Sequence, residues 1–183
     1  MNRFSALIGG LSILAAGCGY SAPTAPTQEA TTTSTFTVPL SPANEVPAVT
    51  NADASGSGTA IIALTVTKDG AGNITSASAN FQINVTGFPA GTRVTDAHIH
   101  NGPAGSNAGA IVNVGLTSGE LAIANGSGSI TKNGINVPAD RAAAILNNRA
   151  GHYFNVHTAL NPDGAIRGQL SAGTFNQGAA VPY

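Results

Sequence analysis

The sequence predicts an all-β domain, an antiparallel Greek-key-like β-sandwich with one short helix. Three observations support this fold class. Apolar and polar residues alternate along several segments, turn residues recur about every ten positions, and Thr, Val, Ile and Gly are frequent while only 8% of residues are charged. The 183 residues are enough for one domain with a hydrophobic core.

The predicted strands follow one another along the chain and are joined by turns. The clearest is 79–85, where Ala79, Phe81, Ile83 and Val85 alternate with polar residues. The segment 138–148 differs: a proline in its first turn, an early acid and an alanine run predict a helix. The full set of predicted strands is 59–67, 79–85, 93–100, 110–116, 120–124, 128–131, 153–159 and 165–170.

Residues 1–17 have the pattern of an export signal. Arg3 precedes an apolar stretch that is too short to span a bilayer, which takes about 20 residues. The stretch ends in Leu14-Ala-Ala-Gly-Cys18, which resembles a bacterial lipobox, although the family prefers leucine where Ala15 stands. The resemblance implies that Cys18 is lipidated and anchors the protein to the cell envelope. A cleaved signal followed by secretion is the alternative.

The chain divides into four parts on this interpretation. Residues 18–35 form a flexible linker rich in Ser, Thr and Pro, 36–172 form the domain, and 173–183 form a C-terminal tail. Gly19 is not the aspartate that retains lipoproteins in the inner membrane, so the outer membrane is expected where the host has one. The formal net charge of −1 offers no basic surface for nucleic acid.

Three histidines share one strand face. His98 and His100 are two residues apart in a strand, so their side chains point the same way and their Cα atoms lie about 6.6–6.8 Å apart. His157 has matching parity, with Phe154 and Val156 turned toward the core. Neutral imidazole is a common ligand for transition metals, so the trio is a candidate metal site on the outside of the sandwich. A polar surface lined by histidines remains the alternative.

The turn Asn161-Pro-Asp-Gly164 sets which residues lie beside His157. A three-residue loop with a glycine bulge pairs His157 with Gln169 and keeps Arg167 next to it. A tight two-residue loop would expose the apolar residues of the last strand. We therefore expect Arg167 and Gln169 to support the ligands or to contact a substrate. His152 has the opposite parity and is expected to be a loop or capping residue.

The chain carries four ordered motifs: Asn44-Glu-Val-Pro-Ala48, Ala97-His-Ile-His-Asn-Gly-Pro-Ala-Gly105, Tyr153-Phe-Asn-Val-His-Thr158 and Asn161-Pro-Asp-Gly-Ala-Ile-Arg-Gly-Gln-Leu170. Together they resemble the CHRD (chordin-type) domain over residues 36–170. This resemblance implies an extracytoplasmic β-sandwich of bacterial surface or secreted proteins. The chain departs from the family at Ala48, where a second proline is usual, and at Ala165, where a glutamate is usual.

A weaker similarity links the chain to copper/zinc superoxide dismutases. It implies that His98, His100 and His157 are copper ligands, but no bridging histidine, zinc loop or cysteine pair can be assembled from the sequence. Three nitrogens with open positions suit Cu(II), or Zn(II) with a bound water. The leading hypothesis is a lipoprotein that stores, delivers or protects copper without turnover. The rivals are a non-metal module that binds an envelope or matrix partner and, third, a dismutase-like enzyme.

Overall fold

The computed structural model describes residues 29–182. The expected export signal, Cys18 and most of the expected linker lie outside the described residues. No helix within 29–182 is long and apolar enough to cross a membrane.

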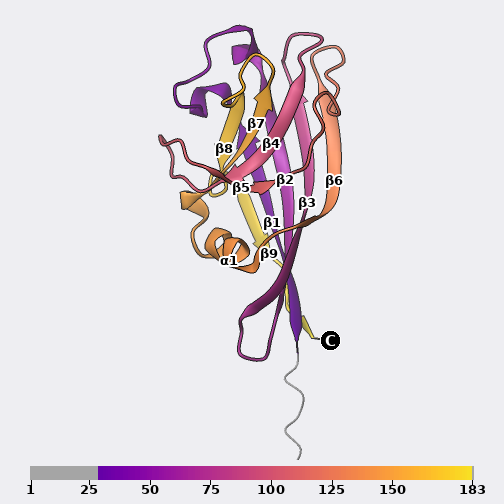
Figure 1. Cartoon of the computed structure of the whole chain (residues 1–183), viewed down its shortest axis with the longest axis vertical. Helices are drawn as coiled ribbons and strands as arrows, with labels where there is room; N and C mark the ends of the chain where they lie inside the picture. The colour runs from indigo at the N-terminus through magenta and orange to yellow at the C-terminus, as the bar shows by residue number, and fades with distance from the viewer. Residues whose placement is uncertain (1–28, 183) are drawn as a thin grey trace, which may run out of the picture.

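Two antiparallel sheets face each other and enclose the core (Figure 1). The larger sheet has the order β10-β1-β2-β3-β6, with β9 also paired to β1, and the smaller has the order β5-β4-β7-β8. The expected all-β sandwich is therefore confirmed. The larger sheet comprises β1 (Ala30–Leu40), β2 (Ser57–Lys68), β3 (Ile74–Thr86), β6 (Gly128–Asn136), β9 (Thr174–Gln177) and β10 (Val181–Pro182). The smaller comprises β4 (Val94–His100), β5 (Ala110–Asn113), β7 (Tyr153–Thr158) and β8 (Ile166–Gln169).

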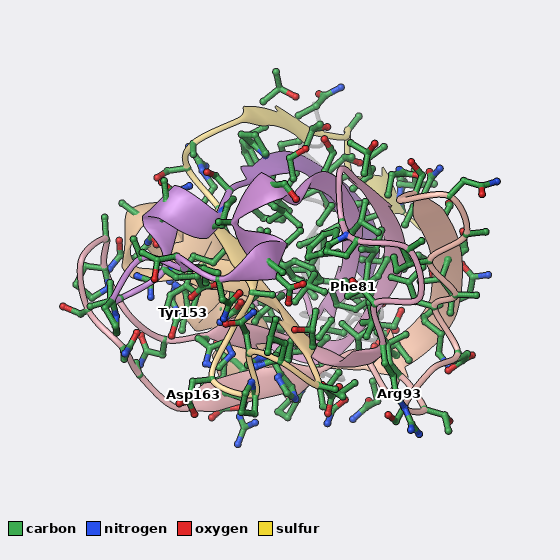
Figure 2. All side chains as sticks on the ribbon, turned by 90° about the horizontal axis from the view of Figure 1, so that it is seen from above. Phe81, Arg93, Tyr153 and Asp163 are labelled. Atoms are coloured by element: carbon green, nitrogen blue, oxygen red, sulfur yellow. The ribbon has the colours of Figure 1, made fainter. Side chains whose placement is uncertain are left out.

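The core is built by the alternation that the sequence displays. Every second residue is buried over 34–40 of β1, 60–66 of β2 and 77–85 of β3, because successive side chains of a strand point to opposite faces. Phe81 of the larger sheet stacks on Phe154 of the smaller one with ring centroids 5.9 Å apart, and both are fully buried. Figure 2 shows Phe81 between the strands, with Arg93 and Asp163 at the periphery. The two sheets are thus joined by direct aromatic contact.

The one predicted helix is present. The helix expected over 138–148 is α1 (Ala139–Asn147), which Pro138 precedes and whose buried residues, Ala142 and Ile145, face the core. The described chain also contains three short 3-10 turns, which the sequence did not predict: η1 (Pro42–Asn44), η2 (Ala52–Ser55) and η3 (Arg149–Gly151).

The prediction of a strand over residues 120–124 is wrong. The segment forms only isolated bridges, at Ala122 and Ala124, because the chain reverses at once through Asn125 and Gly126, both with positive φ. The neighbouring limits shift as well: β5 ends at Asn113 rather than at 116, and β6 continues to Asn136 rather than ending at 131.

The expected linker and tail are partly folded, so both boundaries need correction. β1 begins at Ala30, and residues 30–35 pair with β2 along their whole length. Downstream of 172, β9 pairs with β1 and brings Phe175 to 5.0 Å from the ring of Phe36. A threonine-rich segment has high strand propensity once a partner edge is present, which composition alone does not reveal.

Candidate metal centre

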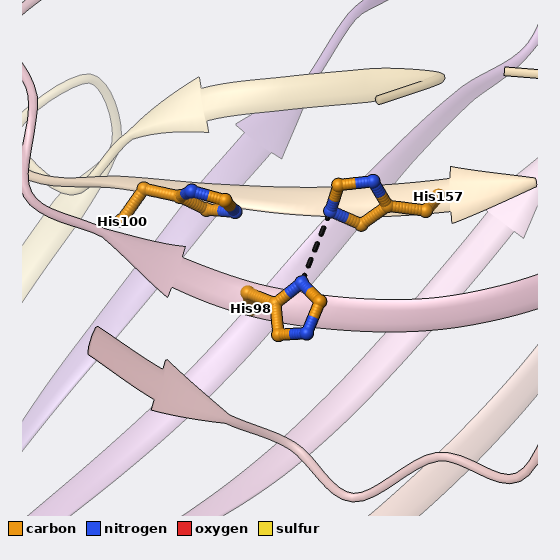
Figure 3. A group of neighbouring side chains, drawn as sticks. All are labelled: His98, His100 and His157. Carbon is orange, nitrogen blue, oxygen red and sulfur yellow. Dashed lines mark hydrogen bonds between the residues drawn. The ribbon is translucent and has the colours of Figure 1, made fainter. Parts of the chain in front are cut away.

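The three candidate histidines come together on the face of the smaller sheet that points away from the core. His98 and His100 are on β4 and His157 is on β7, and one ligand atom from each lies within 4.8 Å of the others. Figure 3 shows a nitrogen of each ring turned toward the space between them. The β4–β7 register that produces this arrangement pairs Asp96 with His157, His98 with Asn155 and His100 with Tyr153.

One nitrogen of each ring is held by an oxygen that can only accept a hydrogen bond. The contacts are His98 Nε2 to Asp96 Oδ2 at 3.1 Å, His100 Nδ1 to the Ala108 carbonyl at 2.8 Å and His157 Nδ1 to the Pro162 carbonyl at 2.9 Å. A neutral ring that donates to this oxygen carries its proton on that nitrogen. Each ring is left with a bare nitrogen on its other side.

The bare nitrogens face one another. His98 Nδ1 lies 3.1 Å from His157 Nε2, the contact marked in Figure 3, and His100 Nε2 is buried with no hydrogen-bond partner. Two lone pairs at this distance repel, so the contact is attractive only when a proton or another cation lies between them. A buried acceptor without a partner is also costly. The arrangement favours a bound cation.

Burial lowers the pKa of all three histidines. For His98 the charge of Asp96 opposes this effect, and for His100 and His157 the carbonyls that hold their Nδ1 atoms oppose it. Mutual repulsion among the rings lowers the values further. Metal ions bind the neutral form of imidazole, so the lowered pKa values favour coordination over protonation.

The histidines are far less accessible than the sequence indicates. His100 and His157 are only 8% and 7% exposed, because the loops 101–109 and 159–165 fold over the outer face of the sheet. Strand parity predicts the face on which a side chain lies, but it carries no information on what covers that face.

The register expected for the last hairpin is wrong, although the parity is right. His157 does not pair with Gln169; instead Tyr153 pairs with Gln169 and Asn155 with Arg167. The connection is the whole loop 159–165, closed by hydrogen bonds onto the carbonyl of Asn161. The shift is an even number of residues, so the apolar residues of β8 remain on the core side.

Arg167 supports the centre through a loop rather than by direct contact. Its guanidinium is 1% exposed, lies 3.8 Å from the Tyr153 ring centroid, and donates to Asn107 Oδ1 at 3.1 Å and the Ser106 carbonyl at 3.0 Å. Tyr153 in turn stacks on His100, with centroids 4.7 Å apart. Arg167 thus fixes the loop 101–109, whose Ala108 carbonyl orients His100.

Gln169, two residues after Arg167 on β8, also holds the loop 101–109. Its Nε2 donates to the Gly102 carbonyl at 3.1 Å, at the start of that loop.

His152 lies apart from the cluster at the end of η3, where its Nδ1 is 2.7 Å from the Asn148 carbonyl. The prediction from sequence did not include Asp96 in the site, although its parity with His98 and His100 places it on the same face.

The motifs that surround this centre match a known family. The family model of the CHRD domain covers residues 36–170. The chain belongs to the CHRD domain family. CHRD domains are generally extracellular, in agreement with an exported protein. No curated protein and no solved structure is significantly similar to the chain.

The spacing of the three histidines in this CHRD domain suits a single metal ion. Zn–N bonds of about 2.0–2.1 Å place two nitrogens of a tetrahedral site about 3.3 Å apart. The 3.1 Å separation of His98 Nδ1 and His157 Nε2 is close to this value. Because the ligand atoms lie within 4.8 Å of one another, the widest separation has to contract by at most about 1.5 Å. The three histidines are therefore close enough to hold one ion.

Proposed function

We propose that this protein is a lipoprotein of the bacterial cell envelope whose CHRD domain binds one transition metal ion, copper preferred, through His98, His100 and His157. The observation that carries the proposal is the hydrogen-bond pattern of the rings. Each outer nitrogen is bound by an acceptor, and the three inner nitrogens are bare and converge. Metal-binding histidines have this pattern, because the outer bond fixes the tautomer and strengthens the ligand.

The donor set favours Cu(II) and leaves Zn(II) as the alternative. Three imidazole nitrogens suit both ions, and copper binds more tightly to a given nitrogen site. Residues 29–182 contain no cysteine or methionine, so the centre as described offers none of the soft sulfur ligands that select Cu(I).

The role that fits best is storage, delivery or protection rather than turnover. A dismutase-like reaction would need a cation free to attract its anionic substrate, and Arg167 is the nearest candidate. Its charge is buried, stacked on Tyr153 and hydrogen bonded to the loop 101–109. Delivery would require an envelope protein that receives the ion.

Thermal unfolding with and without Cu(II) tests the metal assignment. An ion present at 100 times its Kd stabilises the native state by about 2.7 kcal/mol, so the Tm of the apo-protein should rise clearly. His98→Ala should abolish the rise. His152→Ala is the matched control: it loses a buried histidine outside the cluster, so its own Tm falls but the Cu(II)-dependent rise remains. Equal binding by the His98 variant would refute the site. A wild-type Tm that Cu(II) does not raise would favour a non-metal interaction module.

Membrane anchoring needs a separate test. Cys18→Ala should move the protein from the membrane fraction to the soluble fraction and abolish labelling by radioactive palmitate. Labelling that persists in this variant would contradict the proposed anchor. The binding of Cu(II) to the domain should not change, because the centre lies within residues 96–167.

A further inference from the structure

The turn that orients His157 is held from a distant part of the chain. Residues 159–165 connect β7 to β8, and the carbonyl of Pro162 in this turn lies 2.9 Å from His157 Nδ1. A carbonyl that moved away would release the ring to exchange its proton between the two nitrogens. The position of this carbonyl therefore decides whether Nε2 is bare and available.

Asp53, on η2 between β1 and β2, closes that turn. Its carboxylate is 1% exposed, and a single oxygen, Oδ2, accepts from the Thr158 hydroxyl at 2.6 Å and from Asn161 Nδ2 at 2.7 Å. The hydroxyl of Thr158 in turn accepts from the backbone N–H of Asn161 at 3.0 Å. Both ends of the segment before Pro162 are thus tied to one carboxylate.

The direction of each bond requires an acceptor at position 53. Because a carboxylate only accepts, it makes the Thr158 hydroxyl a donor and leaves the hydroxyl lone pairs for the N–H of Asn161. Asn51 adds a second link, since its Nδ2 donates to Asn161 Oδ1 at 2.8 Å and its Oδ1 accepts from the backbone N–H of Asp53. One oxygen of Asp53, Oδ2, thus accepts both side-chain hydrogen bonds that hold the turn.

We infer that Asp53 is a positioning residue of the metal centre, which sets the tautomer of His157 through Thr158, Asn161 and the Pro162 carbonyl. The expected effect of Asp53 on metal affinity rests on the proposed function, whereas its expected effect on the His157 tautomer does not. Each ring then has its own support: Asp96 for His98, the Arg167-bound loop for His100, and the Asp53-bound turn for His157.

The test compares Asp53→Ala, Asp53→Asn and Asp69→Ala. Asp69 is the matched control, because its carboxylate also closes a turn, by accepting from Ala71 and Asn73, but in the β2–β3 hairpin away from the centre. Nitrogen-15 NMR of the apo-proteins reports which nitrogen of His157 carries the proton, and titration with Cu(II) gives the affinity.

The wild type and Asp69→Ala should show His157 protonated on Nδ1 alone. Asp53→Ala should show a mixture of tautomers and bind Cu(II) about 10- to 100-fold more weakly, as is typical when an outer partner of a metal ligand is lost. Asp53→Asn keeps an acceptor oxygen of the same shape and should restore both properties. If Asp53→Ala does not fold, Asn161→Ala removes one arm of the network and should shift the tautomer in the same direction.

An Asp53→Ala protein, or failing that Asn161→Ala, with one His157 tautomer and unchanged Cu(II) affinity would overturn the inference. If the wild type binds no Cu(II), the proposed function fails instead. The NMR comparison then still decides the role of Asp53, because it is made without metal.

Discussion

Replacing Glu45 with glutamine should remove a pH-dependent loss of stability. Glu45 is 7% exposed, and its Oε1 is buried with no hydrogen-bond partner. Burial raises the pKa of this carboxyl to about 7, although the nearby charge of Arg167 and a hydrogen bond from Asn155 oppose the rise. Arg167 offsets only part of the rise, because its guanidinium is stacked on Tyr153 and donates to Asn107 and Ser106 rather than to Glu45.

The direction and size of the effect follow from the two pKa values. Glu45 keeps its proton up to about pH 7 in the folded protein and loses it near 4.5 in the unfolded chain. The folded state therefore loses stability as the pH rises through this window, and the loss is complete above pH 7. The difference corresponds to at most about 3 kcal/mol, which partial contact with solvent reduces.

The assay is urea unfolding of both proteins at about pH 5 and about pH 8. The free energy of unfolding of Glu45→Gln relative to wild type should increase by up to about 3 kcal/mol between the two conditions. Subtraction removes the contribution of the histidines, which both proteins share. Glu120→Gln is the control: Glu120 is bound to Lys132, its pKa is lowered, and its variant should gain nothing at high pH. The same difference at both pH values would refute the reasoning.

Two more predictions concern the centre and its surroundings. In the Glu45→Gln background, acid should destabilise the apo-protein: burial lowers the pKa of the three histidines, so the unfolded chain takes up more protons as the pH falls below about 6.5. A Tm that does not fall between about pH 7 and about pH 5 would contradict this expectation. Gly164→Ala should destabilise more than Gly105→Ala in urea unfolding. A Cβ at 164 would lie 2.5 Å from Asn155 Nδ2 and 2.7 Å from Glu45 Oε2, whereas at Gly105, also with positive φ, nothing lies within 4 Å. Equal costs of the two substitutions would refute the packing argument.

Local patterns predicted the parts of this structure that depend on near neighbours in the chain. Alternation identified β2, β3, β4 and β7, and the proline and alanine pattern identified α1. The same alternation placed His98, His100 and His157 on one face, because side-chain direction in a strand depends only on parity.

Errors arose where a segment's partner is remote. Residues 30–35 were wrongly predicted to be a linker, because the partners of their hydrogen bonds are on β2, more than 25 residues away. The register of β7 and β8 depends on the full loop 159–165, whose closure relies on Asp53, and no local turn rule includes a residue about a hundred positions upstream.

The sequence by itself determined the fold class, the family and the face that carries the histidines, because strand parity and ordered motifs are local properties. Tertiary structure decided that the three rings meet, that loops cover them, and that Asp96, Ala108 and Pro162 leave their inner nitrogens bare. The physical reason is that hydrogen-bond direction and burial are set by groups brought together across the whole chain, and these two quantities turn three histidines into a candidate metal centre.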